Sequence, residues 1–240
     1  METRLSVEAE LARRIEQVRA EIARAAERAG RSPGDVTLVA VSKTVPADRV
    51  RAAAELGITH FGENRVQEAE EKIHALTGCL PPGVTWHMVG HLQSNKARKA
   101  VRLFALIESV DSLELARLLS RLGVERGVPV PVLLEVNVGG EETKFGFAPA
   151  ELSEVFPRIL ELPMLEVRGL MTIAPLVGDP EDARPYFRQL RELRDRLAMA
   201  YPAAELRELS MGMTNDFPVA IEEGATLVRI GRAIFGERPS

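Results

Sequence analysis

The chain has 240 residues, of which 45% are hydrophobic and 28% charged, as in ordinary soluble globular proteins. The formal net charge of -4 and the lack of basic runs argue against a nucleic acid or an anionic membrane surface as a partner. The single cysteine, Cys79, excludes an intrachain disulfide, and the charged N-terminus does not resemble a secretory signal. We therefore expect a cytoplasmic protein that binds neither nucleic acid nor membrane.

The first segment is predicted to be a helix. Apolar side chains recur at helical spacing with charged residues between them, at Leu11, Ile15, Val18 and Ile22. Gly30 and the turn sequence that follows it end the pattern. We expect residues 1–30 to form an extra N-terminal helix that packs on the main body of the protein.

Short β-rich runs then alternate with helical patterns. The runs lie at 37–41, 58–61, 85–89, 106–110, 130–138, 165–171, 205–211 and 226–230. The helical segments lie at 46–56, 63–75, 96–104, 112–122, 149–160, 180–200 and 216–223, with a last turn at 233–236. Alternation of this kind predicts parallel strands with right-handed crossovers, and eight units favour a (β/α)8 TIM barrel in one domain, 1–240. A doubly wound open sheet is the alternative, but no glycine-rich fingerprint follows the first strand.

Lys43 is the first candidate functional residue, because it follows the first predicted strand. Functional sites of β/α barrels form at the carboxyl ends of the strands. A lysine there would be partly desolvated, which lowers its pKa and frees the amine to attack a carbonyl. It could equally be a surface lysine whose stem extends out of the core. Position alone does not decide between the two, although the chain has only five lysines among its 31 basic residues.

The ends of the seventh and eighth predicted strands carry candidate anion ligands. Phosphate is frequently held at this place in β/α barrels. Ser210 offers a hydroxyl, Gly231 lets the backbone approach an anion, and the amides of Gly231 and Arg232 can open the last helical turn onto it. A lysine for an aldehyde and a cradle for a phosphate are the two anchors that pyridoxal 5'-phosphate (PLP) requires.

The chain closely resembles the pyridoxal phosphate homeostasis proteins (the YggS/PROSC type). The resemblance covers LVAVSKTVP, HFGENRVQEAEEK, WHMVGHLQSNK, EVNVGGEETKFGF, RGLMTIAP and LSMGMTNDFPVAIEEGATLVRIGRAIFG, in this order. It implies the barrel domain that is also found at the N-terminus of alanine racemases. It further implies that Lys43 is the Schiff-base lysine and that Ser210, Gly231 and Arg232 hold the phosphate. Arg229 would face the pyridine nitrogen, and Asn64 and Met213 would line the same pocket.

Arg229 has a chemical consequence under this resemblance. A permanently charged arginine disfavours protonation of the pyridine nitrogen, so the ring would be a weak electron sink. The alternative is an arginine at a strand end that pairs with Glu222 or Glu223.

The resemblance implies a carrier of PLP that exchanges it with client PLP-dependent enzymes. An amino-acid racemase of the alanine racemase type is the alternative, and an interaction module without cofactor is a third hypothesis. The related racemases add a second domain that completes a dimeric site and supplies a tyrosine base, whereas this sequence ends soon after its eighth unit. Tyr186 and Tyr201 are predicted on the outside of the barrel. We therefore expect a monomer without catalytic turnover.

Three further residues are weighed at the mouth of the predicted barrel. Lys144 is a solvated loop lysine or, alternatively, a second acceptor that relays PLP outward. His87 is predicted to lie in the core or the barrel lining, and His91 in a loop near the mouth. Neither their spacing nor an HExxH pattern predicts a metal site.

Overall fold

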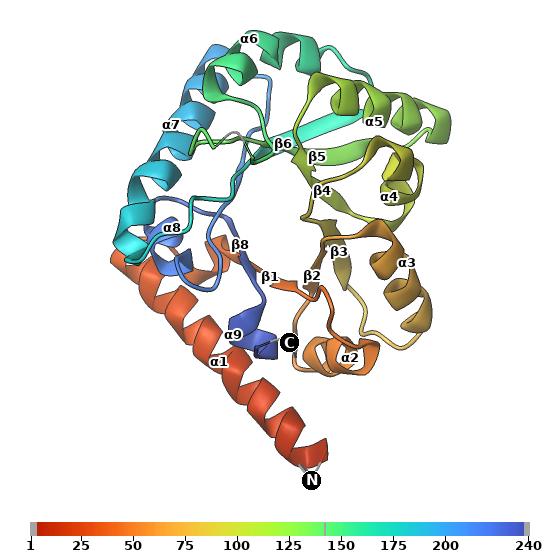
Figure 1. Ribbon diagram of the computed structural model, residues 1–240, viewed down its shortest axis with the longest axis vertical. Coiled ribbons are helices and arrows are strands. Elements are labelled where there is room, and N and C mark those ends of the chain that lie inside the picture. The colour runs from red at the N-terminus through yellow and green to blue at the C-terminus, as the bar shows by residue number, and fades with distance from the viewer. Residues whose placement is uncertain (1–3, 142, 238–240) are drawn as a thin grey trace.

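Eight parallel strands form a closed barrel in the computed structural model, which describes residues 4–141 and 143–237 (Figure 1). The strands are paired in chain order, and β1 also pairs with β8 to close the barrel. Their bounds are β1 Thr37–Val41, β2 His60–Glu63, β3 Thr85–Met88, β4 Leu106–Val110, β5 Val130–Glu135, β6 Leu165–Met171, β7 Glu208–Ser210 and β8 Leu227–Ile230. The predicted β/α barrel is thereby confirmed.

Helices surround the barrel on its outer side (Figure 1). Their bounds are α1 Arg4–Arg28, α2 Ala47–Glu55, α3 Val66–Ala75, α4 Ala97–Leu103, α5 Leu113–Arg126, α6 Pro149–Leu160, α7 Arg184–Ala200, α8 Phe217–Glu222 and α9 Arg232–Phe235. The helix predicted at 180–200 begins with a separate 3-10 turn, Pro180–Ala183, before α7. Within the part of the chain that the structure describes, no helix is long and apolar enough to cross a membrane.

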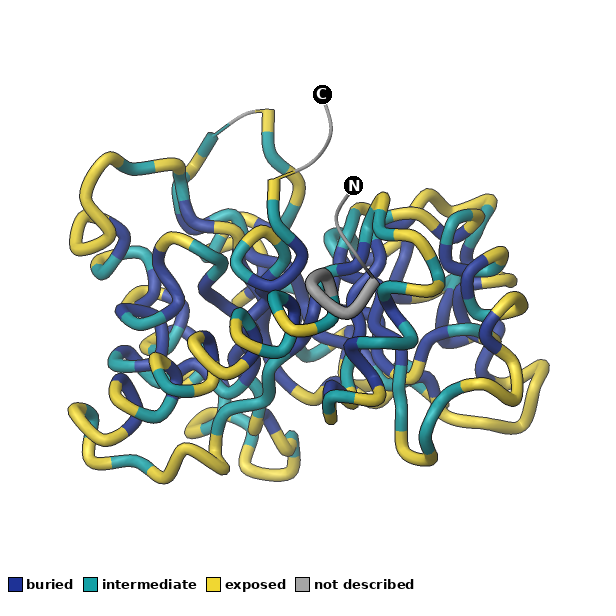
Figure 2. Tube along the Cα trace, turned by 90° about the horizontal axis from the view of Figure 1, so that it is seen from below, coloured by how far each residue is buried: buried dark blue, intermediate teal, exposed yellow. Residues whose placement is uncertain are grey.

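Two apolar clusters stabilise this arrangement. The smaller cluster lies inside the barrel and consists of Val39, Val89, Leu106, Leu133, Met171 and Leu227, with Val41 packed against it. The larger cluster lies between the strands and the surrounding helices, and Figure 2 shows these buried segments inside a shell of exposed loops and helix faces. Burial of apolar surface in both layers is the main force that holds strands and helices together.

The predicted N-terminal helix, α1, lies along the outer side of α8 and α9 (Figure 1). Its apolar face is buried, with Leu11, Ile15, Val18 and Ile22 at most 5% exposed. Just beyond its end, Arg31 Nη1 donates to the carbonyl oxygens of Ile221 and Ala225 at 3.0 and 2.8 Å. The helix is thus attached to the segment that leads into β8.

The second strand and the helix after it begin later than predicted. The strand was expected at 58–61 and the helix from residue 63, but β2 ends at Glu63 and α3 begins at Val66. Glu63 is fully buried at the strand end. It accepts hydrogen bonds from Lys72 Nζ at 2.5 Å and from Ser42 Oγ at 2.7 Å. These partners let a charged residue occupy a position that the sequence pattern assigns to a helix surface.

β3 and β8 are each one residue shorter than predicted, whereas β5 and β7 are shorter by three and four residues. β5 ends at Glu135 instead of 138, because the Asn137 side chain donates to the carbonyl oxygen of Glu141 at 2.8 Å and turns the chain into a loop. β7 covers only Glu208–Ser210 of the predicted 205–211. After β7 the chain enters the loop that carries Met213 and Thr214, which line a cavity at this end of the barrel.

Candidate functional site

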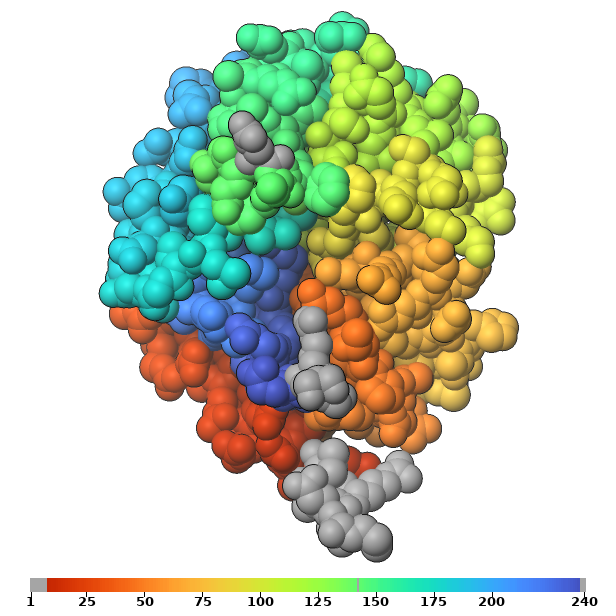
Figure 3. Space-filling model, viewed as in Figure 1, coloured from red at the N-terminus to blue at the C-terminus, as the bar shows by residue number. Residues whose placement is uncertain are grey.

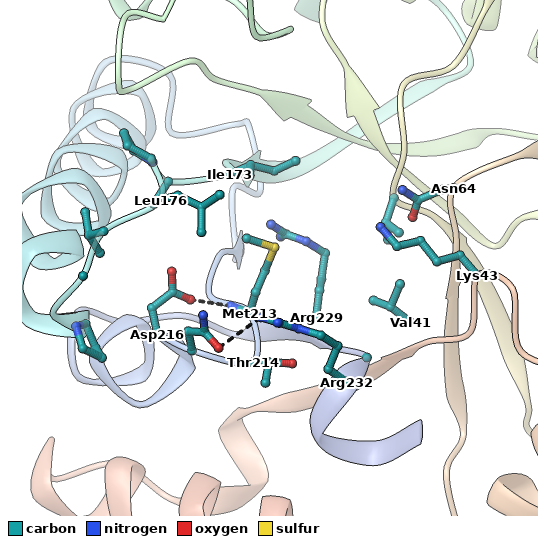
Figure 4. Close-up of a pocket in the computed structure, with 18 residues that line it drawn as sticks. Val41, Lys43, Asn64, Ile173, Leu176, Met213, Thr214, Asp216, Arg229 and Arg232 are labelled. Atoms are coloured by element: carbon teal, nitrogen blue, oxygen red, sulfur yellow. Dashed lines mark hydrogen bonds between the residues drawn. The ribbon is translucent and has the colours of Figure 1, made fainter. Parts of the chain in front are cut away.

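A cavity of about 480 Å³ opens at the carboxyl ends of the strands. Six of the seven predicted site residues line it, namely Lys43, Asn64, Met213, Arg229, Gly231 and Arg232. They come from the ends of β1, β2, β7 and β8, and all of them except Gly231 are labelled around one space in Figure 4. In the space-filling view, the blue C-terminal segment lies between the cyan and orange segments on this face (Figure 3). The volume is within the range of small-molecule sites.

Lys43 follows β1 and extends into this cavity. Its side chain is half-buried and lies next to Asn64, on the opposite side of the cavity from Met213 (Figure 4). Gly90 lets the segment after β3 lie close to the backbone of Asn64, since a Cβ at Gly90 would lie 2.6 Å from the Asn64 carbonyl oxygen. The structure therefore places Lys43 in the cavity, as expected for a lysine that reacts with a bound carbonyl compound.

Two charged side chains of α3 hold the backbone on both sides of Lys43. Lys72 Nζ donates to the Ser42 carbonyl oxygen at 2.7 Å as well as to Glu63. Glu68 accepts from the backbone amide of Thr44 at 2.5 Å, and Thr44 has a left-handed backbone with φ of 63°. Burial raises the pKa of Glu63, and hydrogen bonds from Lys72 and Ser42 oppose that shift. The backbone on both sides of Lys43 is thus held by hydrogen bonds with side chains of α3.

Arg229 is buried at the floor of the cavity and is tied to the barrel at two points. Its Nη1 donates to Ser210 Oγ at 2.5 Å and its Nη2 to the Thr172 carbonyl oxygen at 2.7 Å. Burial lowers the pKa of Arg229, while the charges of Glu108, Glu135 and Asp216 act in the opposite direction. An arginine nevertheless stays charged in proteins. The cavity therefore has a fixed positive charge at its floor.

The alternative pairing of Arg229 with the acidic residues at the end of α8 is wrong. Glu222 pairs with Arg28 and Arg184, and Glu223 pairs with Arg184, Arg188 and Arg191. These ion pairs attach α7 and α1 to α8 on the outside of the barrel.

Ser210 does not reach the cavity. It is fully buried in β7, and its hydroxyl donates to Glu108 Oε2 at 2.5 Å while it accepts from Arg229. The structure thus does not place this hydroxyl where an anion in the cavity could meet it. Thr214, four residues further on, lines the cavity instead. Thr214 was not among the predicted site residues, although a hydroxyl between two predicted elements at the barrel mouth was a signal for it.

The segment after β8 approaches β1 closely. A Cβ at Gly231 would lie 3.2 Å from the Val41 carbonyl oxygen, so a glycine is favoured there. Gly231 precedes α9, and Arg232 opens it and donates through Nη2 to Asn215 Oδ1 at 3.2 Å. The dashed lines in Figure 4 mark this bond and the one from the Met213 amide to Asp216 Oδ1, which is 2.6 Å long. These bonds order the loops on that side of the cavity.

The β6–α7 loop forms the remaining wall and was not predicted. Its residues 173–178 line the cavity, and Leu176 is 90% exposed at the rim. Ile173 and Leu176 lie on the side opposite Lys43 (Figure 4). The apolar run after the sixth strand was the signal available in the sequence, since contiguous apolar side chains on a surface loop can mark a ligand-binding groove.

The charge of the lining favours an anionic ligand. Among the residues that line the cavity, Lys43, Arg229 and Arg232 are basic and Asp216 alone is acidic. Burial raises the pKa of Asp216, and a hydrogen bond from the Met213 backbone and the charge of Arg229 oppose this. An amine, two guanidinium groups and a hydroxyl around one cavity suit a phosphorylated carbonyl compound.

Comparison with known proteins shows to which family the chain belongs. The model of the alanine racemase N-terminal domain matches residues 14–239. The pyridoxal phosphate homeostasis protein of Aquifex aeolicus is 48% identical over 94% of this chain and 97% of its own length. The protein of that name from Escherichia coli K12 is 40% identical over 95% of this chain and 97% of its own length. This chain belongs to the pyridoxal phosphate homeostasis protein family.

Solved structures agree with the membership in the homeostasis family. PipY of Synechococcus elongatus, solved with PLP bound, is 41% identical, with a TM-score of 0.83 over 94% of this chain and 100% of its own. An alanine racemase of Clostridium difficile is 17% identical, with a TM-score of 0.65 over 86% of this chain and 56% of its own. At this identity the comparison with the racemase shows a shared fold and nothing about a shared activity.

Lys144 lies beside the cavity of this homeostasis family member. Its Nζ donates to the carbonyl oxygen of Ala174, which lines the cavity, at 3.4 Å, and it forms an ion pair with Glu141. Its side chain is half-buried between the loop after β5 and the loop after β6. Whether it accepts PLP stays a prediction.

The histidines occupy the two places that were predicted. His87 is buried in the barrel lining, with its Nδ1 2.6 Å from Glu108 Oε1. His91 is exposed in the loop after β3 and stacks on Phe145, with ring centroids 3.7 Å apart. Among residues 4–141 and 143–237, no group of three or more His, Cys, Asp or Glu side chains could hold a metal ion.

Proposed function

We propose that this protein binds PLP as a Schiff base on Lys43 and takes part in intracellular PLP homeostasis, holding the cofactor and exchanging it with client enzymes. The observation that carries the proposal is Lys43 in a basic cavity at the end of β1. The PLP-bound structure of PipY, 41% identical to this chain, supports the choice of ligand.

The residues present fit the chemical groups of PLP. The Lys43 amine, once neutral, condenses with the aldehyde, so that a carbon–nitrogen double bond forms and one water leaves. Thr214, the backbone at Gly231 and the guanidinium of Arg232 are proposed to hold the phosphate. Ser210, which the resemblance assigned to the phosphate, is hydrogen-bonded to Arg229 and Glu108 and does not line the cavity. Asn64 and Met213 are proposed to bound the ring.

Arg229 is proposed to face the pyridine nitrogen. PLP supplies an electron sink for carbanion chemistry when this nitrogen is protonated. A guanidinium that is permanently charged disfavours that proton. The cavity would therefore hold PLP in a form with low reactivity, which suits storage and transfer better than turnover.

The position of the tyrosines favours a carrier over a racemase. Tyr186 packs against the apolar cluster outside the barrel, and the ring of Tyr201 lies 5.4 Å from that of Phe156. Both belong to the part of the chain that the structure describes, and neither lines the cavity. The relatives from Aquifex aeolicus and Escherichia coli, which are matched over 97% of their length, are named homeostasis proteins.

The test is the visible absorbance spectrum of the purified protein with PLP, followed by borohydride reduction and peptide mapping. Wild type is expected to absorb and to carry the reduced adduct on Lys43. Lys43→Ala is expected to lose this adduct, whereas Lys99→Ala, a change at an exposed lysine paired with Glu70, retains it. An adduct on another lysine of the wild-type protein contradicts the proposal, as does the absence of any adduct.

Turnover and exchange are tested separately. A PLP-dependent racemase or decarboxylase rate that Lys43→Ala abolishes would refute the absence of catalysis. For exchange, we compare the rate of PLP transfer to an apo-enzyme between wild type and Lys144→Ala. Equal rates would remove the relay through Lys144.

A further inference from the structure

A chain of polar side chains crosses the barrel interior below Arg229. Thr85 Oγ1 lies 2.9 Å from His60 Nδ1, which lies 3.0 Å from His87 Nε2. His87 Nδ1 lies 2.6 Å from Glu108 Oε1, and Glu108 Oε2 accepts from Ser210 Oγ at 2.5 Å. The chain therefore runs from the amino ends of β2 and β3 to the residue that contacts Arg229.

Glu108 is the charged group at the centre of this chain. It is fully buried in the middle of β4, where an unpaired carboxylate would be costly. Burial acts to raise the pKa of Glu108, but the hydrogen bond and charge of His87, the charge of Arg229 and the hydrogen bond from Ser210 lower it overall. Glu108 is thus a carboxylate that faces the positive charge of Arg229 inside the barrel.

Glu108 is not among the residues that line the cavity, whereas Arg229 is. The hydrogen-bonded route from Glu108 to a bound ligand therefore runs through Ser210 and Arg229. The Ser210 hydroxyl can accept a hydrogen bond from Arg229 Nη1 when its own O–H points away from the guanidinium. Glu108 Oε2 accepts a hydrogen bond from that O–H and so fixes its direction. The Thr172 carbonyl oxygen holds Nη2, so two fixed acceptors set the orientation of the guanidinium.

We propose that Glu108, acting through the Ser210 hydroxyl, is a positioning residue that aims the Arg229 guanidinium at the ring nitrogen of PLP. The proposal rests on the proposed function, because it takes PLP as the ligand and Arg229 as its partner at that nitrogen. Glu108 itself does not touch the ligand. Its effect should be confined to the part of the binding free energy that depends on the ring nitrogen.

The experiment compares two ligands, PLP and the analogue in which a carbon–hydrogen group replaces the ring nitrogen. The affinity for each is measured by the absorbance change on binding to wild type and to Glu108→Gln. The variant is expected to bind PLP about tenfold more weakly, because a charge-assisted hydrogen bond that orders Arg229 is lost. It is expected to bind the analogue within about twofold of wild type, since no ring nitrogen is present to be contacted.

Ser210→Ala is the second variant and keeps the proposal testable if Glu108→Gln folds poorly. It removes the bridge without adding or removing charge, and the same selective loss for PLP is expected. Glu223→Gln is the matched control, since it removes another buried carboxylate paired with arginines, outside the barrel. It should leave both affinities unchanged.

Two outcomes overturn the proposal. One is an equal loss of affinity for both ligands in Glu108→Gln and Ser210→Ala, which would indicate a structural role. The other is unchanged PLP affinity in both variants. A failure of the proposed function looks different, because wild type itself would then give no borohydride-trapped adduct on Lys43.

Discussion

Several charged residues are buried inside the barrel or between its strands and the surrounding helices. Glu63, Lys72, Glu108, Glu135 and Arg229 are all less than 10% exposed. Charges are rarely buried without a partner, because their desolvation costs several kcal/mol, on the order of 5. The partners described above keep them in place, so individual substitutions should have large and specific effects.

Glu135 should make the stability of the ligand-free protein depend on pH. Burial and the charge of Asp111 raise the pKa of Glu135 to about 7, against the opposing charge of Arg229. A carboxyl whose pKa is higher in the folded than in the unfolded state favours folding when protonated. This contribution is present below the unfolded value and is lost as pH rises through about 7.

We expect the free energy of unfolding of wild type to fall by up to about 3 kcal/mol between about pH 5 and about pH 8 through this group. The free energy of unfolding of Glu135→Gln, measured by urea unfolding, should change less with pH over the same range. Glu154→Gln, at an exposed position of α6, is the control and should follow wild type. Parallel pH curves for wild type and Glu135→Gln would contradict the assignment.

Lys72 should be critical for stability although it does not line the main cavity. Lys72→Met leaves the Glu63 carboxylate buried without its cation, and we expect a loss of about 3–5 kcal/mol in the free energy of unfolding. The double variant Glu63→Gln/Lys72→Met also removes the unpaired carboxylate, and it should recover a large part of the lost free energy of unfolding. Urea unfolding of the single and double variants measures both steps. A double variant no more stable than Lys72→Met would show that charge pairing is not the cause.

At the scale of elements, α1 should act as a brace for the segment that carries Arg232. Ile15 is 2% exposed on its buried face, and the helix contacts both α8 and α9. Ile15→Ala should lower the free energy of unfolding by about 2–4 kcal/mol through the cavity it leaves. Glu16→Ala, at the exposed neighbouring position, should change it little. A loss below about 1 kcal/mol in Ile15→Ala would mean that α1 packs loosely.

The existence of the elements could be predicted from sequence more accurately than their ends. β1, β4 and β6 have the predicted bounds because apolar periodicity alone defines them. The end of β2 was misplaced because Glu63 is satisfied by Lys72 on α3, a tertiary contact that periodicity does not contain. The polar residue within the apolar run of β4, Glu108, was a visible signal in the sequence of a polar network inside the barrel.

At the scale of the whole molecule, the location of the site followed from topology. Parallel strands in a barrel bring their carboxyl ends together, so Lys43 and Arg232 could be placed at one mouth from sequence. The direction of each side chain could not, because it depends on the register of the closed barrel. Ser210 and Arg229 are the example, since both were assigned to the ligand and Ser210 instead contacts Glu108 behind it.

Ligand binding should therefore stabilise the molecule as a whole, because the cavity spans the β1–β8 pairing that closes the barrel. Lys43 follows β1 and Gly231 follows β8, so a ligand held by both joins the first and last strands. PLP at about 100 times its dissociation constant should add about 2.7 kcal/mol to the free energy of unfolding. Thermal unfolding with and without PLP measures this gain for wild type and for Lys43→Ala, which should lose most of it at the same PLP concentration. Lys99→Ala should keep the full gain, and a gain of equal size in Lys43→Ala would mean that the covalent link contributes nothing to the closure of the barrel.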